Sequence, residues 1–171
     1  MKLADAIAIC LRDNGIRHVF CVSGGASLHL IHGIANTEGI DYVCPQHEQA
    51  AGFAADAYAR FVGIGCALAT SGPGATNLVT CIATSYYDSV PTIYLTGQTT
   101  TSRIDNKGTR QIGFQATPIV PMVSGITKYA AEPLGASDVI PTIEHALKVA
   151  KSGRPGPVLV SICDDLQRIE I

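Results

Sequence analysis

The apolar residues of the chain follow two alternating periods. Segments with the three-to-four-residue period of an amphipathic helix alternate with short apolar runs typical of buried strands. Helices are predicted at residues 3–14, 27–35, 47–61, 75–87, 115–122 and 137–151. Strands are predicted at residues 18–22, 41–45, 66–70, 92–97, 126–130 and 157–162. This alternation predicts a three-layer α/β/α fold with a mainly parallel sheet of about six strands.

Polar or glycine-rich turns follow four of these strands. Gly24, Glu48, Ser71 and Gln98 each come shortly after a strand end. Ligands of parallel sheets collect at the carboxyl ends of the strands, so four distant segments are predicted to meet at one edge. The polar, aperiodic stretch from Gln98 to Gly113 is interpreted as a functional loop.

Length and composition indicate one domain. The chain has 171 residues, 47% of them hydrophobic and 15% charged, and no repeat or linker divides it. Residues 1–171 are therefore predicted to form one domain.

A net charge of −2, with scattered lysines and arginines, argues against nucleic acid as a partner. No signal peptide or membrane span is recognisable, so we expect a cytoplasmic protein that does not bind a membrane.

Local sequence leaves the chemistry of the turns open. Glu48 lies in the first turn of an alanine-rich helix, where a carboxylate also complements the positive end of the helix dipole. Desolvation by apolar neighbours would instead let it share a proton with a heterocycle. Residues 71–77 (SGPGATN) offer N–H groups at a helix start, but they match neither a P-loop nor GxGxxG. The local sequence is compatible with either a phosphate or a flat polar ring as the ligand.

Three other chemistries are disfavoured. The chain has five histidines and no GxSxG elbow, which argues against a Ser-His-Asp triad. His29 and His32 lie one helical turn apart without a third ligand nearby, which favours packing or solvation over a metal. The six cysteines are dispersed through apolar stretches without a CxxC pair, so they are predicted to be reduced and buried.

An ordered set of segments resembles one enzyme family. It comprises HVFCVSGGAS, PQHEQAAGFAADAYAR, ATSGPGATNLVT, DSVPTIYLTGQ, GFQATPIV, ITKYA and SGRPGPVLV, between Lys2 and Gln167. This set resembles the N-terminal, pyrimidine-binding (PYR) domain of thiamine-diphosphate enzymes, and above all of acetolactate synthases and acetolactate-synthase-like proteins. The resemblance implies a decarboxylase and carboligase that acts on a small 2-oxo acid, with pyruvate as the donor.

The resemblance implies that Glu48 activates thiamine diphosphate. The carboxylate would hydrogen-bond the pyrimidine ring and favour the imino tautomer, whose nitrogen removes the thiazolium C2 proton to give a nucleophilic ylid. Gly24 and Gly25 match a turn whose backbone approaches the thiazolium. Pro73 and Asn77 match residues that line the pyrimidine pocket.

Further positions match residues around the family's active site. Phe114 and Gln115 match a pair that borders it, and Gln115 is expected to take part in cofactor binding and catalysis. Lys128 matches a lysine at the mouth of the substrate channel. Ser89 and Arg154 match positions associated with flavin in acetolactate synthases, so the resemblance admits FAD as a second cofactor.

The absence of a GDG signature limits what this chain does alone. In the family, Mg²⁺ and the diphosphate are held by a second domain that carries this signature. The resemblance therefore implies a diphosphate-binding domain or subunit as partner, a homo-oligomer, and a chain that is inactive by itself. The surface that faces this partner is predicted to be lined by Ala51, Ala54 and Ala55.

Three alternatives remain open. The chain carries RQIG before Phe114 and Gln115, two residues more than acetolactate synthases, which leaves a sugar as an alternative acceptor. One subunit of a split decarboxylase of the sulfopyruvate or phosphonopyruvate type would also fit the chain length. A catalytically silent binding or dimerisation module is the non-enzymatic alternative, against which the intact Glu48 argues.

Overall fold

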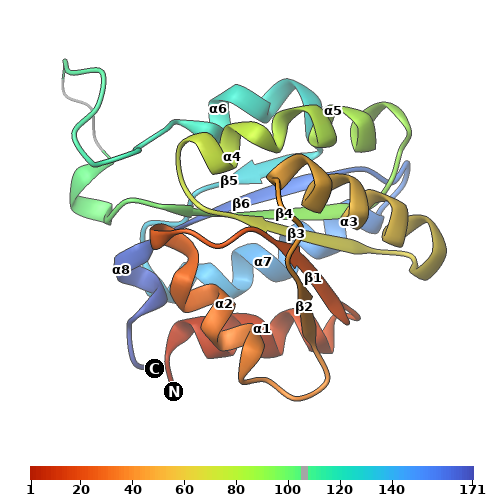
Figure 1. Cartoon of the computed structure of the whole chain (residues 1–171), viewed down its shortest axis with the longest axis horizontal. Helices are drawn as coiled ribbons and strands as arrows, with labels where there is room; N and C mark the ends of the chain where they lie inside the picture. Colours follow the sequence, from red (N-terminus) through yellow and green to blue (C-terminus); the bar gives the residue numbers. More distant parts are fainter. Residues whose placement is uncertain (105–107) are drawn as a thin grey trace.

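One six-stranded parallel sheet forms the centre of the protein (Figure 1). The computed structural model describes residues 1–104 and 108–171, so residues 105–107 of the predicted loop lie outside the described part. The strands are β1 (His18–Cys21), β2 (Asp41–Val43), β3 (Gly65–Ala69), β4 (Thr92–Gln98), β5 (Tyr129–Ala131) and β6 (Val158–Cys163). Their order is β2-β1-β3-β4-β6-β5, and every neighbouring pair is parallel. The predicted sheet is confirmed.

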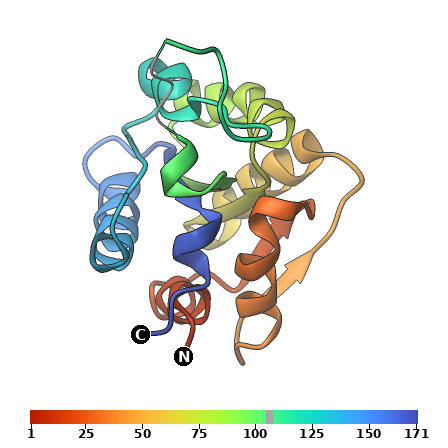
Figure 2. The same cartoon turned by 90° about the vertical axis from the view of Figure 1, so that its left-hand side faces the viewer.

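Helices cover both faces of the sheet (Figure 1). One layer contains α1 (Leu3–Asp13), α2 (Leu28–Ala35), α7 (Ala136–Lys151) and the short α8 (Asp164–Gln167). The other contains α3 (Glu48–Val62), α4 (Pro73–Asn77), α5 (Val79–Tyr87) and α6 (Ile119–Val123). The 3₁₀ turns of the described residues are η1 (Gly25–Ser27), η2 (Thr101–Arg103) and η3 (Ser124–Ile126). The three-layer α/β/α prediction is therefore confirmed, and Figure 2 shows the two chain ends lying side by side.

The hydrophobic core consists of two clusters, one on each face of the sheet. In α1, Leu3, Ile7 and Leu11 recur at every fourth position and are buried on the first face. On the second face, Leu78 and Tyr94 are buried together with small residues of α3 and α4. Strands β3, β4 and β6 are buried along their whole length, because helices cover them on both sides.

Two helices differ from the sequence prediction. The helix predicted at residues 75–87 is divided at Leu78 into α4 and α5. The helix predicted at residues 115–122 begins only at Ile119. Pro118 explains the late start, since proline disfavours the helical conformation of the residue before it. Helix α8 was not predicted.

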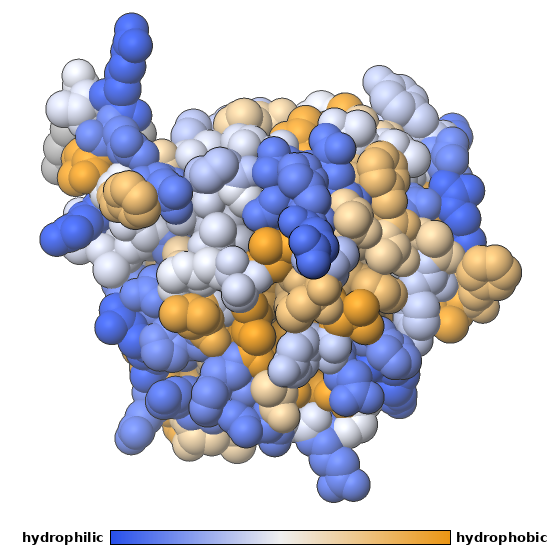
Figure 3. Space-filling view, in the orientation of Figure 1, coloured by the Kyte–Doolittle hydropathy of each residue, from blue (hydrophilic) through white to orange (hydrophobic). Residues whose placement is uncertain are grey.

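An exposed apolar surface lies over β2 and α3 (Figure 3). The alanines expected on this surface are not its main component, because Ala51 and Ala55 are fully buried. Large side chains are exposed there instead: Tyr42, Val43, Phe53, Phe61 and Val62. All three residues of the edge strand β2 are exposed. No helix in the described ranges is long and apolar enough to span a membrane.

The close contact between β3 and α3 gives a stability prediction. A Cβ on Gly65 would collide with the backbone carbonyl of Ala55. We expect Gly65→Ala to lower the free energy of unfolding by about 1–3 kcal/mol, measured by urea denaturation. Gly125→Ala is the control, since a Cβ there meets nothing within 4 Å. Equal effects of the two substitutions would contradict the close packing.

Candidate functional site

The turn after β1 is held against the turn after β3 at the carboxyl edge of the sheet. The Thr70 hydroxyl accepts a hydrogen bond from the Ala26 N–H at 3.2 Å. A Cβ on Gly24 would lie only 2.5 Å from Thr70 Cβ, so the two turns touch at a position that admits no side chain. Gln167 of α8 clamps the same turn, because its Nε2 donates to the Ala26 carbonyl at 2.8 Å. Gln167 was not singled out in the sequence.

Glu48 and Asn77 are brought together at this edge. Glu48 is the first residue of α3 and half-buried, and Asn77 Nδ2 donates to Glu48 Oε2 at 2.9 Å. A Cβ on Gly74 would lie 3.3 Å from Glu48 Oε1 and 2.9 Å from Thr70 Cγ2. The lack of a side chain at Gly74 therefore leaves space beside the carboxylate. Pro73, at the first position of α4, is exposed at the same edge.

A second group of predicted residues lines one cavity of about 260 Å³. Gly25, Phe114 and Gln115 line it together with Ser71. Gln115 has a φ of 56°, a left-handed conformation that is uncommon outside glycine. Gly72 accommodates this conformation, since a Cβ on it would lie 2.7 Å from Gln115 Cβ. The Phe114 side chain is 83% exposed and is available to a ligand or a partner.

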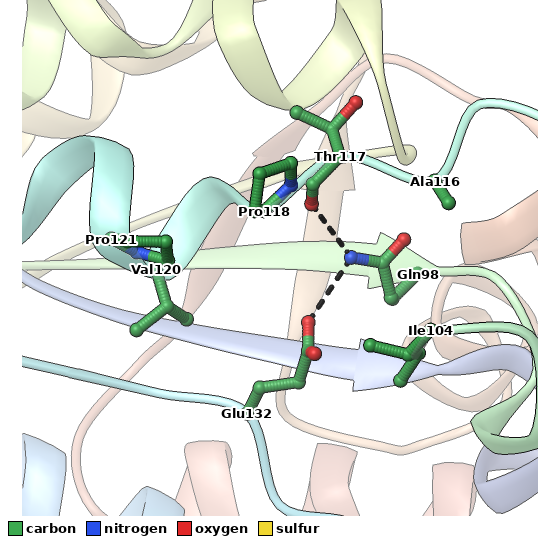
Figure 4. Close-up of a pocket in the computed structure, with 8 residues that line it drawn as sticks. All are labelled: Gln98, Ile104, Ala116, Thr117, Pro118, Val120, Pro121 and Glu132. Carbon is green, nitrogen blue, oxygen red and sulfur yellow. Dashed lines mark hydrogen bonds between the residues drawn. The ribbon is translucent and has the colours of Figure 1, made fainter. Parts of the chain in front are cut away.

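Gln98 lies in a buried polar network next to a smaller cavity of about 100 Å³ (Figure 4). Its Nε2 donates to the Thr117 carbonyl at 2.8 Å and to Glu132 Oε2 at 3.1 Å. The Ser161 hydroxyl donates to the same Glu132 oxygen at 2.8 Å. Glu132 was missed in the sequence, although a carboxylate shortly after a predicted strand is the signal that singled out Glu48.

Lys128 lies at the opposite edge of the sheet. It precedes β5, and its ammonium donates to the carbonyls of Val149 and Ser152 at 2.5 Å each. These carbonyls belong to the end of α7, where a positive charge is favourable. Desolvation lowers the pKa of Lys128 below its ordinary value. Within this chain, the structure does not bring Lys128 and Glu48 together.

Ser89 and Arg154 meet at this amino-terminal edge as well. Arg154 Nε donates to the Ser89 hydroxyl at 2.5 Å, and Ser89 has a φ of 61°. Arg154 lines a cavity of about 290 Å³ together with Lys128, Tyr86 and Tyr87. The predicted flavin-associated pair is therefore in contact, but separate from Glu48.

The described residues contain no group of three or more His, Cys, Asp or Glu side chains that could hold a metal ion. His29 lies near a single carboxylate, with Nε2 at 4.0 Å from Asp164 Oδ1.

Five of the six cysteines are buried as predicted, whereas Cys44 is exposed. It is exposed because it follows β2, an outer strand of the sheet that has a neighbour on one side only.

A buried network fixes α3, the helix that carries Glu48. Asp56 is 4% exposed and accepts hydrogen bonds from Arg60 Nε at 2.8 Å and from the Ser85 hydroxyl at 2.7 Å. Ser85 also hydrogen-bonds the Tyr94 hydroxyl at 2.8 Å, which connects α3 to α5 and β4. Burial raises the pKa of Tyr94 well above its ordinary value, so its hydroxyl stays protonated. The other end of Arg60 pairs with Asp88 at 2.7 Å.

The chain is similar to a known protein family and to several characterised proteins. The family described as "Thiamine pyrophosphate enzyme, N-terminal TPP binding domain" matches residues 1–118. The chain is 42% identical over 168 residues to the chloroplastic acetolactate synthase of Arabidopsis thaliana, a match that covers 98% of this chain and 24% of that protein. It is 39% identical over 163 residues to the acetolactate synthase large subunit of Haemophilus influenzae, covering 95% of this chain and 28% of that protein. The chain thus spans about a quarter of the length of these relatives.

The two carboxylates that pair with Arg60 are predicted to differ in their contribution to stability. We expect Asp56→Asn to lower the free energy of unfolding by about 1–3 kcal/mol, because it replaces a buried acceptor of charge-assisted hydrogen bonds. Asp88 is 52% exposed, so Asp88→Asn should cost less than about 1 kcal/mol. Chemical denaturation of both variants measures the difference. A larger loss for Asp88→Asn would contradict the assigned role of the network.

Proposed function

Because the chain belongs to the thiamine pyrophosphate enzymes, we propose that it is the pyrimidine-binding domain of a 2-oxo acid decarboxylase and carboligase of the acetolactate synthase type. The observation that carries this proposal is the Glu48 carboxylate, held by Asn77 at the carboxyl edge of the sheet. Identities of 39–42% to acetolactate synthases over nearly the whole chain support this choice of reaction type.

The residues at this edge fit the pyrimidine half of thiamine diphosphate. Glu48 Oε2 is engaged by Asn77, and Gly74 leaves open the space next to Oε1. A flat ring placed there would meet a half-buried carboxylate that can hold or release a proton at a ring nitrogen. When bound, thiamine diphosphate supplies a carbon nucleophile and an electron sink for 2-oxo acids.

Each residue of the site has a distinct task in this proposal. Glu48 exchanges the proton with the pyrimidine, and Asn77 keeps the carboxylate pointed at it. Gly24 lets its turn pack directly against Thr70, and the open space at Gly25 would accept the thiazolium and the substrate beside it. Gln115 borders the cavity in which the small 2-oxo acid, pyruvate in this proposal, would react.

The complete site requires a partner. We assign Mg²⁺ and the diphosphate to a second domain or subunit, which would meet this one in a cytoplasmic homo-oligomer. Residues 1–171 then constitute one pyrimidine-binding domain that is inactive alone.

The Arg154–Ser89 pair beside Tyr86 and Tyr87 offers a positive charge and aromatic rings, which supports FAD as the ligand of that cavity. Phe114 and Lys128 would border the substrate channel once a partner is in place.

Glu48→Gln tests the proposed function in the enzyme assembled with its diphosphate-binding domain. The amide preserves the shape of the side chain but cannot exchange the proton, so we expect turnover of pyruvate to fall by about 10²–10⁴-fold. Glu38→Gln is the matched control, because Glu38 is exposed after α2 and outside the site. Near-normal turnover of the Glu48 variant would refute the assignment.

The exposed apolar surface over β2 and α3 leads to a prediction about association. We expect the chain to self-associate with rising concentration, because Phe61 is 90% exposed on α3, which also exposes Val62 and Phe53. Light scattering should show this, and Phe61→Ser should weaken it. Met122→Ser is the control, since Met122 is 50% exposed but lies on α6. A monomer at all concentrations would contradict the prediction.

A further inference from the structure

Two cysteines lie side by side at the carboxyl ends of β1 and β2, at the edge of the sheet where Glu48 lies. The parallel register pairs Val19 with Tyr42 and Phe20 with Val43, so the next residues, Cys21 and Cys44, stand opposite each other. Their sulfurs are 3.7 Å apart, with Cys21 fully buried and Cys44 exposed. We propose that Cys21 and Cys44 are a modification site, which a hydroperoxide converts into a reversible disulfide through initial attack by Cys44.

The backbone geometry is compatible with this bond. Neighbouring strands lie about 4.7–4.9 Å apart, and disulfides span Cα separations of about 4.4–6.8 Å. Side chains directly opposite each other in a sheet project from the same face. Forming the bond requires the sulfurs to approach from 3.7 Å to about 2.0 Å. Side-chain rotation and a small shift of the strand end achieve this without opening the core.

The difference in exposure assigns the order of the two steps. The Cys44 thiolate attacks the peroxide oxygen and the O–O bond breaks, which leaves a sulfenic acid on Cys44 and releases water or an alcohol. The Cys21 sulfur then displaces the sulfenyl hydroxyl, which leaves as water with the Cys21 proton while the S–S bond forms. Two electrons pass from the thiol pair to the peroxide, and a dithiol reverses the reaction by exchange.

Burial supports the second role for Cys21. It raises the pKa of this thiol to about 12, and the hydrogen bond with Cys44 adds to the effect. Cys21 therefore remains a protonated thiol at neutral pH, enclosed by the core. It reacts only when an electrophilic sulfur forms next to it, so the two cysteines have different roles.

The disulfide would act on Glu48 through a short stretch of backbone. Glu48 lies four residues after Cys44, and Gly24 lies three residues after Cys21. Drawing Cys44 toward β1 displaces the start of α3 relative to α4, and thereby lengthens the 2.9 Å hydrogen bond from Asn77 to Glu48. This effect on turnover rests on the function proposed above, whereas formation of the bond does not.

The positions of basic residues allow a direct assay of the bond. Between Arg17 and Arg60 there is no lysine or arginine, so trypsin releases residues 18–60 as one peptide whose only cysteines are Cys21 and Cys44. After treatment of the purified chain with hydrogen peroxide and alkylation of the unfolded protein, we expect this peptide to carry no alkyl group. Further cleavage after Glu38 should then give two peptides that stay joined by the disulfide until it is reduced. An alkylated peptide, or a Cys44 disulfide between two chains, would overturn the proposal.

Two variants test the order of the steps. Cys44→Ser alters an exposed position, and peroxide should leave its Cys21 fully open to alkylation. In Cys21→Ala, Cys44 should accumulate as a sulfenic acid that a 1,3-diketone probe traps. Loss of Cys21 alkylation in Cys44→Ser, at the rate seen in the unaltered chain, would show that the assigned order is wrong.

The assembled enzyme tests the coupling to Glu48. Peroxide is expected to lower turnover by about 10²-fold in the unaltered enzyme, as for other small misplacements of catalytic groups. Cys44→Ser should resist this loss, and dithiothreitol should reverse it in the unaltered enzyme. Full turnover in an enzyme with the mapped disulfide would refute the coupling. Failure of Glu48→Gln to affect turnover would instead refute the proposed function and leave the disulfide result unaffected.

Discussion

Parallel pairing across the whole sheet is the constraint on which the rest of the structure depends. It places the carboxyl ends of all strands at one edge and requires every connection to cross back over a face of the sheet. The crossover helices bury both faces, which is why the central strands are apolar throughout. Close packing follows from this, as at Gly65, where the backbone of α3 leaves no room for a side chain on β3.

The same constraint creates the environment of Glu48. The carboxylate begins α3 after β2, whereas Asn77 ends α4 after β3, and β1 lies between these two strands in the sheet. The buried Asp56 network then fixes α3 against α5 and β4. From local sequence alone, Glu48 could simply have complemented the helix dipole. In the structure it has a fixed hydrogen-bond partner, Asn77, and free space beside Gly74.

Strand register has a second chemical consequence at this edge. The alignment of β1 with β2 that delivers Glu48 to the site also sets Cys21 opposite Cys44. Because β2 is the outer strand, one sulfur of the pair is accessible and the other is enclosed. Cys21 and Cys44 are 23 residues apart in the chain, and their proximity arises only from the pairing of the strands.

Elements and their order were predictable from sequence because hydrophobic period is a local property, expressed within each run of residues. The ordered motifs likewise singled out Glu48 and Asn77, which the structure joins by a hydrogen bond. Sequence did not reveal the break at Leu78, helix α8, the Glu132 network or the exposure of Cys44. The resemblance assigned Lys128 to the mouth of the substrate channel and Ser89 and Arg154 to flavin-associated positions, and only the structure shows that all three lie at the amino-terminal edge, away from Glu48. These features depend on which strand lies beside which and in what register, and contacts between distant segments fix them only when the whole sheet has assembled.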